Sequence, residues 1–115
     1  MSKPGKTTNT DILCEAILSL ENVDECKNFL RDLMTEQEIE AINSRLQCAI
    51  LITEGIPYRQ ISKITNLSTT TVSRVAFWLN RGKNGYKTVI ERLKKKKIIS
   101  PTTLNLETNI HHKPV

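Results

Sequence analysis

Residues 57–79 constrain the fold more than any other stretch, because they predict two short helices joined by a turn of about 3–4 residues. Pro57 suits the first position of a helix, where a missing backbone N–H costs nothing. Asn66 tolerates the left-handed conformation that ends a helix, and the Ser68 hydroxyl can cap the N-terminus of the next one. The second helix has one apolar stripe, formed by Val72, Val75 and Leu79.

Small polar side chains lie at the start of the second helix, away from its apolar stripe: Thr69, Thr70 and Ser73. Two short helices, a tight turn and such side chains are the pattern of a helix-turn-helix. A recognition helix presents its first turns to base edges, where Ser and Thr can meet donors or acceptors. The pattern also fits an ordinary antiparallel helix pair in a small helical core, since the motif is degenerate.

The charge of the chain is divided unevenly between its two halves. The 115 residues carry a net charge of +5. Residues 1–55 contain five basic and ten acidic side chains, whereas residues 56–115 contain twelve basic and two acidic ones. A basic excess in the half that holds the helix pair indicates a nucleic-acid or anionic-membrane surface, and combined with the motif it favours DNA.

Four further helices are predicted around this pair. One begins near Asn9 or Thr10, and the others cover about 23–33, 36–54 and 86–96. No segment shows a persuasive strand pattern, so the sequence predicts an all-α fold of about six helices. Apolar side chains follow a helical period in the first helix, at Ile12, Leu13, Ala16, Ile17 and Leu20, and form a continuous stripe in the third, at Ile39, Ile42, Leu46, Ala49 and Ile50. The side chains expected to face inward from the other two are Cys26, Phe29, Leu30, Leu33, Tyr86, Val89, Ile90 and Leu93. The apolar first helix would be too exposed if left unpacked, which favours a partner for it.

The longest of these helices has clear signals at both ends. Thr35 and Glu38 have the spacing of a capping box, in which each side chain bonds to the other residue's backbone N–H. Gly55 ends the helix. We expect this helix to be the centre of the core.

The expected domain organisation is a flexible arm over residues 1–8, one helical domain over 9–97 and a disordered tail over 98–115. The last helix ends in four consecutive lysines, Lys94–Lys97. Cations suit a helix C-terminus, so these lysines fit a solvated helix end. They also fit a patch that contacts phosphates, and the sequence leaves both readings open.

Several kinds of protein are not expected from this sequence. No run of about 18 apolar residues could span a membrane, and no apolar signal core is present, so a cytoplasmic protein is expected. Cys14, Cys26 and Cys48 form no Cys-x-x-Cys pair and are expected to be buried, reduced thiols. His111 and His112 lack a second pair at metal-ligand spacing. Without a phosphate loop, a metal cluster or a catalytic set, an enzyme is not expected.

A series of residues at fixed offsets runs through the middle of the chain. It comprises Phe29, Asp32, Leu33, Thr35, Glu38, Arg45, Gly55, Tyr58, Ile61, Ser62, Thr65, Ser68, Thr70, Thr71, Val72, Ser73, Arg74, Val75, Leu79, Asn80, Gly82, Gly85 and Tyr86. On these residues the span from Phe29 to Leu93 resembles the Trp repressor superfamily, specifically its YerC/YecD-type, TrpR-related branch. So many offsets make the resemblance more specific than a lone helix-turn-helix match.

The resemblance implies a six-helix, intertwined homodimer that binds palindromic operators in double-stranded DNA and represses transcription. A two-fold protein would match half-sites about one helical turn apart. The implied first motif helix is Tyr58–Thr65 and the recognition helix is Ser68–Leu79. The DNA-binding residues that the resemblance implies are Arg59, Gln60, Lys63, Thr69, Thr70 and Ser73. Ser68 at the start of the second helix, and Lys94 and Lys95 in the basic half of the chain, complete the expected DNA-binding set.

The resemblance also implies a position for a small-molecule corepressor. Its pocket residues correspond to Thr35, Arg45, Thr71 and Arg74. Two positions depart from the Trp repressor proper, which has a glycine at the position of Val75 and a serine at that of Trp78. Both substitutions add bulk where the ligand would lie, so we expect that tryptophan does not bind. Arg45 and Arg74 can instead be structural, and Trp78 can itself fill the pocket, which would make DNA binding independent of a ligand.

The function favoured by these observations is a sequence-specific DNA-binding transcriptional regulator, a repressor located in the cytoplasm at the nucleoid. Two alternatives remain from the sequence alone. One is a dimeric protein-interaction module whose basic end docks on an acidic partner. The other is a DNA-targeting domain like those of transposase-associated proteins, which share the motif. Discrimination between duplex sequences would separate a base reader from a merely basic module.

Overall fold

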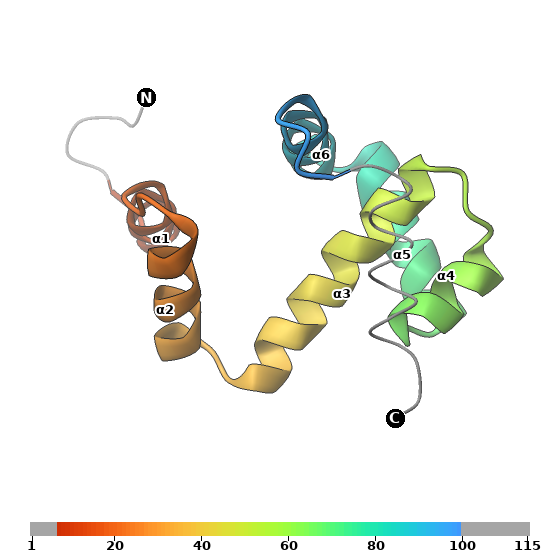
Figure 1. The fold of residues 1–115 in the computed structure, drawn as a ribbon, viewed down its shortest axis with the longest axis horizontal. Coiled ribbons are helices and arrows are strands. Elements are labelled where there is room, and N and C mark those ends of the chain that lie inside the picture. Colours follow the sequence, from red (N-terminus) through yellow and green to blue (C-terminus); the bar gives the residue numbers. More distant parts are fainter. Residues whose placement is uncertain (1–6, 100–115) are drawn as a thin grey trace. The chain divides into compact units, whose positions relative to one another are not determined.

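A computed structural model describes residues 7–99 and shows six α-helices, with no strand among those residues (Figure 1). The expectation of an all-α fold with six helices is confirmed. No helix in this part of the chain is long and apolar enough to cross a membrane. The helices are α1 (Asn9–Leu18), α2 (Val23–Leu33), α3 (Glu36–Thr53), α4 (Tyr58–Thr65), α5 (Thr69–Arg81) and α6 (Gly85–Lys95).

The chain folds into two compact units, one ending at Ile39 and the other beginning at Glu40, so that α3 starts in the first unit and ends in the second. The expected arm 1–8 and tail 98–115 lie mostly outside the described residues, and the expected 9–97 domain stays a prediction. Helix starts in the first unit are well capped. The predicted capping box of Thr35 and Glu38 is confirmed, with backbone-to-side-chain distances of 2.9 and 3.1 Å.

The helices of the first unit present apolar side chains to solvent, and neither α1 nor α2 contains a buried residue. The prediction that Leu33 of α2 faces inward is therefore wrong. Two short helices cannot enclose a core by themselves, because too little surface is removed from water. Leu33 is 53% exposed, and the exposed apolar side chains in the helical stripe of α1 are Ile12, Leu13 and Ile17.

The core lies in the second unit, where the last turns of α3 pack with α4, α5 and α6. α5 contacts both α4 and α6. Only the C-terminal part of the predicted α3 stripe is buried, and Ile42 and Val89 are exposed, contrary to expectation. Both of these exposed residues line an open groove of this unit. The buried apolar side chains of the core cluster are Cys48, Ala49, Ile50, Leu51, Ile61, Val72, Val75, Leu79 and Ile90.

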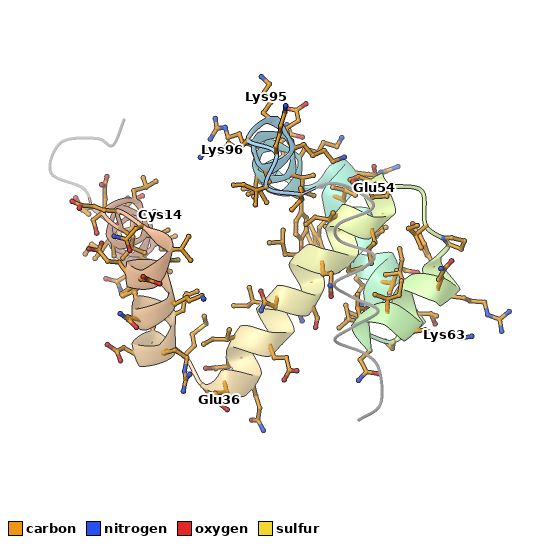
Figure 2. The ribbon with its side chains drawn as sticks, viewed as in Figure 1. Cys14, Glu36, Glu54, Lys63, Lys95 and Lys96 are labelled. Atoms are coloured by element: carbon orange, nitrogen blue, oxygen red, sulfur yellow. The ribbon has the colours of Figure 1, made fainter. Side chains whose placement is uncertain are left out.

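The three cysteines occupy three different environments. Cys48 is fully buried, and burial raises the pKa of its thiol to about 11 because the thiolate is desolvated. Cys26 is half-buried and Cys14 is exposed, so the expectation of three buried thiols is wrong for Cys14. Cys14 lies on α1 (Figure 2), where no core exists to cover it.

α3 and α6 end in the same hydrogen-bonded turn. After α3, Gly55 adopts a positive φ of 82°, and the N–H of Ile56 donates to the carbonyl of Leu51 at 3.2 Å. After α6, Lys97 has a φ of 59°, and the next N–H donates to the carbonyl of Leu93 at 3.0 Å. This is a Schellman motif, whose left-handed position is usually glycine. A lysine there carries steric strain that glycine would avoid.

We therefore predict that Lys97→Gly raises the free energy of unfolding by about 0.5–1 kcal/mol. The matched control is Lys96→Gly, which removes the same charge at a right-handed position and should lower stability by a similar amount. Urea unfolding of the two variants measures both effects. A loss of stability in Lys97→Gly would contradict the strain that its positive φ indicates.

Candidate nucleic-acid interface

α4 buries one side and presents the other to solvent. Pro57 precedes the helix as its N-cap residue, one position before the one predicted for it. Ile61 and Thr65 are the buried residues of α4. The side chains on its other faces that were expected to approach DNA are all exposed: Arg59, Gln60 and Lys63. Figure 2 shows Lys63 projecting from α4.

The turn between α4 and α5 is fixed by side-chain hydrogen bonds. Asn66 has a φ of 66°, which confirms the predicted left-handed helix stop. The hydroxyl of Thr65, which is 2% exposed, donates to the carbonyl of Ile61 at 2.8 Å and accepts from the N–H of Leu67 at 3.3 Å. The hydroxyl of Ser62 donates to the carbonyl of Leu67. These bonds hold α4 and α5 at one angle.

α5 begins as predicted, with Ser68 as its N-cap. The Ser68 hydroxyl accepts from the N–H of Thr71 at 3.1 Å and donates to the Thr71 hydroxyl at 3.0 Å. Both hydroxyls are thus engaged in capping the helix. Thr69, Thr70 and Ser73 are exposed. The opposite side of α5 is buried, including the predicted stripe: Val72, Val75, Ala76 and Leu79.

The stretch that forms this interface contains no acidic residue. Between Glu54 and Glu91 the chain has six basic side chains and no Asp or Glu. A surface with cations and no anions attracts a polyanion without local repulsion. The six basic side chains are Arg59, Lys63, Arg74, Arg81, Lys83 and Lys87.

Lys94 and Lys95 occupy different environments at the end of α6. The Lys94 ammonium lies 3.5 Å from the Glu54 carboxylate, whose side chain is only 6% exposed. This pair ties α6 to the end of α3. Figure 2 shows Lys95 and Lys96 at the end of α6, well separated from Lys63 on α4. Whether Lys94 and Lys95 contact phosphates stays a prediction.

Two of the expected effector-pocket residues have structural roles. The Thr35 hydroxyl caps α3, and the Thr71 hydroxyl contributes to the cap of α5. Arg45 lines an open groove of about 680 Å³, which Thr71 and Arg74 do not line. Thr35 belongs to the other compact unit.

Trp78 and Tyr86 line this groove together with Arg45. The pKa of the Tyr86 hydroxyl is raised mainly by burial, and the nearby positive charge of Arg45 opposes this shift. Val75, the other bulky departure from the resembled pattern, is buried in the core and does not line the groove. The groove holds no cluster of metal ligands, and neither does any other described part of the chain; His111 and His112 lie outside the described residues.

Three features of the interface were not found from the sequence. The turn bonds of Ser62 and Thr65 require knowing where the chain reverses, although Ser and Thr near a helix end are a general signal for such bonds. The Glu54–Lys94 pair joins residues forty positions apart, for which the sequence carries no signal. The exposure of Phe77 was also missed, although its helical spacing from Thr70 is visible in the sequence.

The fold and this interface define an all-α helix-turn-helix protein with a basic outward face. The sequence model of the family described as "Trp repressor protein" matches residues 8–94. The chain belongs to the Trp repressor family. Members of this family are DNA-binding regulators rather than enzymes, which supports the corresponding expectations at that coarser level.

Individual relatives agree with this membership. YerC, an uncharacterized protein of Bacillus subtilis (strain 168), is 40% identical over 84 residues, which cover 73% of this chain and 81% of YerC. The crystal structure of a TrpR-like protein from Eubacterium eligens ATCC 27750 superposes with a TM-score of 0.72 at 40% identity, covering 76% of this chain and 91% of that one. A candidate Trp repressor from Staphylococcus aureus gives a TM-score of 0.70 at 40% identity, covering 74% and 85%.

The two lysines at the end of α6 give a test. Lys94→Met should lower the free energy of unfolding by about 1–2 kcal/mol, because it leaves the Glu54 carboxylate buried without its partner. Lys95→Met is the matched control and should leave the free energy of unfolding unchanged. For DNA binding, it should lower the slope of log affinity against log salt concentration by about the amount expected for one phosphate contact. Thermal unfolding and salt titrations measure both. Equal stability of the two variants would show that the Glu54 pair does not stabilise α6.

Proposed function

We propose that this protein is a sequence-specific DNA-binding transcriptional regulator, a repressor, that reads double-stranded DNA with α4 and α5. The observation that carries the proposal is the outward face of these helices. It combines small polar side chains at the start of α5 with exposed Arg59 and Lys63 on α4, in a stretch free of acidic residues. Phosphate contacts from α4 would fix the register, and Thr69, Thr70 and Ser73 would read base edges.

The proposed functional form is a homodimer on a palindromic operator. The support is the apolar surface of α1 and α2, which lack a single buried residue in the protomer. Exposed apolar area of this extent is unfavourable unless a partner covers it. The family relationship supports a second copy as that partner, and two-fold symmetry then implies two half-sites. A DNA-binding regulator would act in the cytoplasm, at the nucleoid.

The proposed regulator binds DNA without tryptophan. Trp78 lines the groove beside Arg45, so its indole adds bulk at a position where the Trp repressor proper has a serine. The Thr71 hydroxyl is engaged in the cap of α5, which leaves it less able to bind a ligand. Because Val75 is buried in the core, the argument against tryptophan rests on Trp78 rather than on both substitutions.

The direct test is selection of duplexes from a random-sequence pool by the full chain with no ligand added. We predict enrichment of one palindrome. Thr70→Ala should bind that palindrome more weakly and tolerate base changes at one position per half-site. At that position, the free-energy preference for the selected base over the others should fall by roughly 1–3 kcal/mol. Val89→Ala, a control on α6, should keep the preference. No enrichment by a folded protein would instead favour a basic protein-interaction module.

A second test addresses the effector. Affinity for the selected palindrome should be the same with and without millimolar L-tryptophan, measured by fluorescence anisotropy of labelled DNA. Calorimetry of the protein with L-tryptophan should show no binding. A tenfold or greater increase in DNA affinity on adding tryptophan would overturn the proposal of ligand independence, while leaving the DNA-binding proposal intact.

A further inference from the structure

α5 carries a large aromatic side chain on its outward face. Phe77, one of the two phenylalanines in the chain, is 50% exposed to solvent. It follows Thr70 by seven residues, which places the two within about 20° of each other around the helix and about 10 Å apart along it. Phe77 therefore extends the proposed base-reading face of α5 by one turn beyond Ser73.

The surroundings of Phe77 fit a nucleic acid better than an apolar protein partner. Arg74 and Arg81 lie one turn before and one turn after it on the same exposed side of α5. No acidic residue lies anywhere on α4 or α5. An apolar ring between two cations matches the major groove, where apolar thymine methyl groups lie between two phosphate backbones.

Trp78 orients the ring of Phe77. The two rings meet edge to face, with centroids 5.1 Å apart and an interplanar angle of 86°. Such pairs are favourable beyond their buried area, so the contact restricts the rotamers of Phe77. A side chain with restricted rotamers loses less conformational entropy when it binds, which favours a well-defined contact.

We propose that Phe77 is a specificity-determining residue that contacts the C5-methyl group of a thymine in each half-site. This inference rests on the proposed function and adds a reading residue to it. Homeodomain recognition helices read bases from four positions spaced i, i+3, i+4 and i+7, so a helix can use two turns of one face. In α5 the same spacing is occupied by Thr70, Ser73, Arg74 and Phe77. Apolar side chains, Phe among them, are known partners of the thymine methyl.

The experiment replaces each thymine of the selected palindrome in turn with deoxyuridine, which removes only the methyl group. The wild-type chain should lose about fourfold in affinity per half-site at one thymine position, the value for one buried methyl. Phe77→Ala should bind the thymine operator more weakly and show a thymine-to-deoxyuridine affinity ratio near one at that position. Phe77→Leu should retain part of the ratio, since it keeps an apolar tip.

Val89→Ala is the matched control, because it also truncates an exposed apolar side chain but lies on α6. It should keep every thymine-to-deoxyuridine ratio. If Phe77→Ala lowers affinity while all thymine-to-deoxyuridine affinity ratios stay as in the wild type, the proposed contact of Phe77 with a thymine methyl is overturned. A changed oligomeric state of Phe77→Ala with unchanged ratios would likewise overturn it and assign Phe77 to a subunit contact. If the wild type selects no sequence, the proposed function fails together with this inference.

Discussion

The geometry of the candidate interface depends on the short turn between α4 and α5. A two-helix motif is useful for reading DNA only if both outward faces are held at one angle. Here the carbonyl and the N–H of Leu67 are both bonded to side chains of α4, and Thr65 is buried with its hydroxyl fully used. Removing such a partner would leave a partly buried backbone group of the turn without its bond, at a cost of about 1 kcal/mol. The N–H of the left-handed Asn66 donates to the carbonyl of Ser62 at 2.9 Å, which adds a backbone bond to the same turn.

The core explains why this turn is stable enough to orient a surface. Leu51, Ile61 and Val72 come from three different helices and are all at most 1% exposed. The last turns of α3 therefore serve as the platform on which α4 and α5 pack. The described helices of the first unit, α1 and α2, contain no buried residue, and this unit carries most of the acidic side chains. The two units thus differ in both burial and charge, and only the second combines a rigid core with a basic surface.

The local features of the fold were predictable from the sequence, because they depend on neighbours only a few residues away. Ser68 as an N-cap and the Thr35–Glu38 capping box follow from side chains that bond within one turn, and Asn66 as a helix stop follows from its tolerance of the left-handed conformation. The all-α class follows from helical periodicity for the same reason.

Burial was less predictable, because periodicity identifies an apolar side of a helix but not what covers it. Ile42 belongs to a regular stripe on α3 and yet is exposed, since the groove that it lines is open. Val89 fails in the same way on α6, and Cys14 fails on a helix without a core. The role of Lys94 was ambiguous for a different reason: its partner Glu54 lies forty residues earlier, and only the packing of α6 on α3 brings them together.

The two aromatic residues of α5 connect the groove beside Arg45 with the outward face of the helix. Trp78 lines the groove next to Arg45, and its ring also contacts Phe77 on the outward face of the same helix. Gly82 limits how this end of α5 can change, because a Cβ there would lie 2.4 Å from the Trp78 carbonyl oxygen. Trp78 therefore belongs to both surfaces, so that replacing its indole would change the wall of the groove and remove the edge-to-face support of the Phe77 ring together.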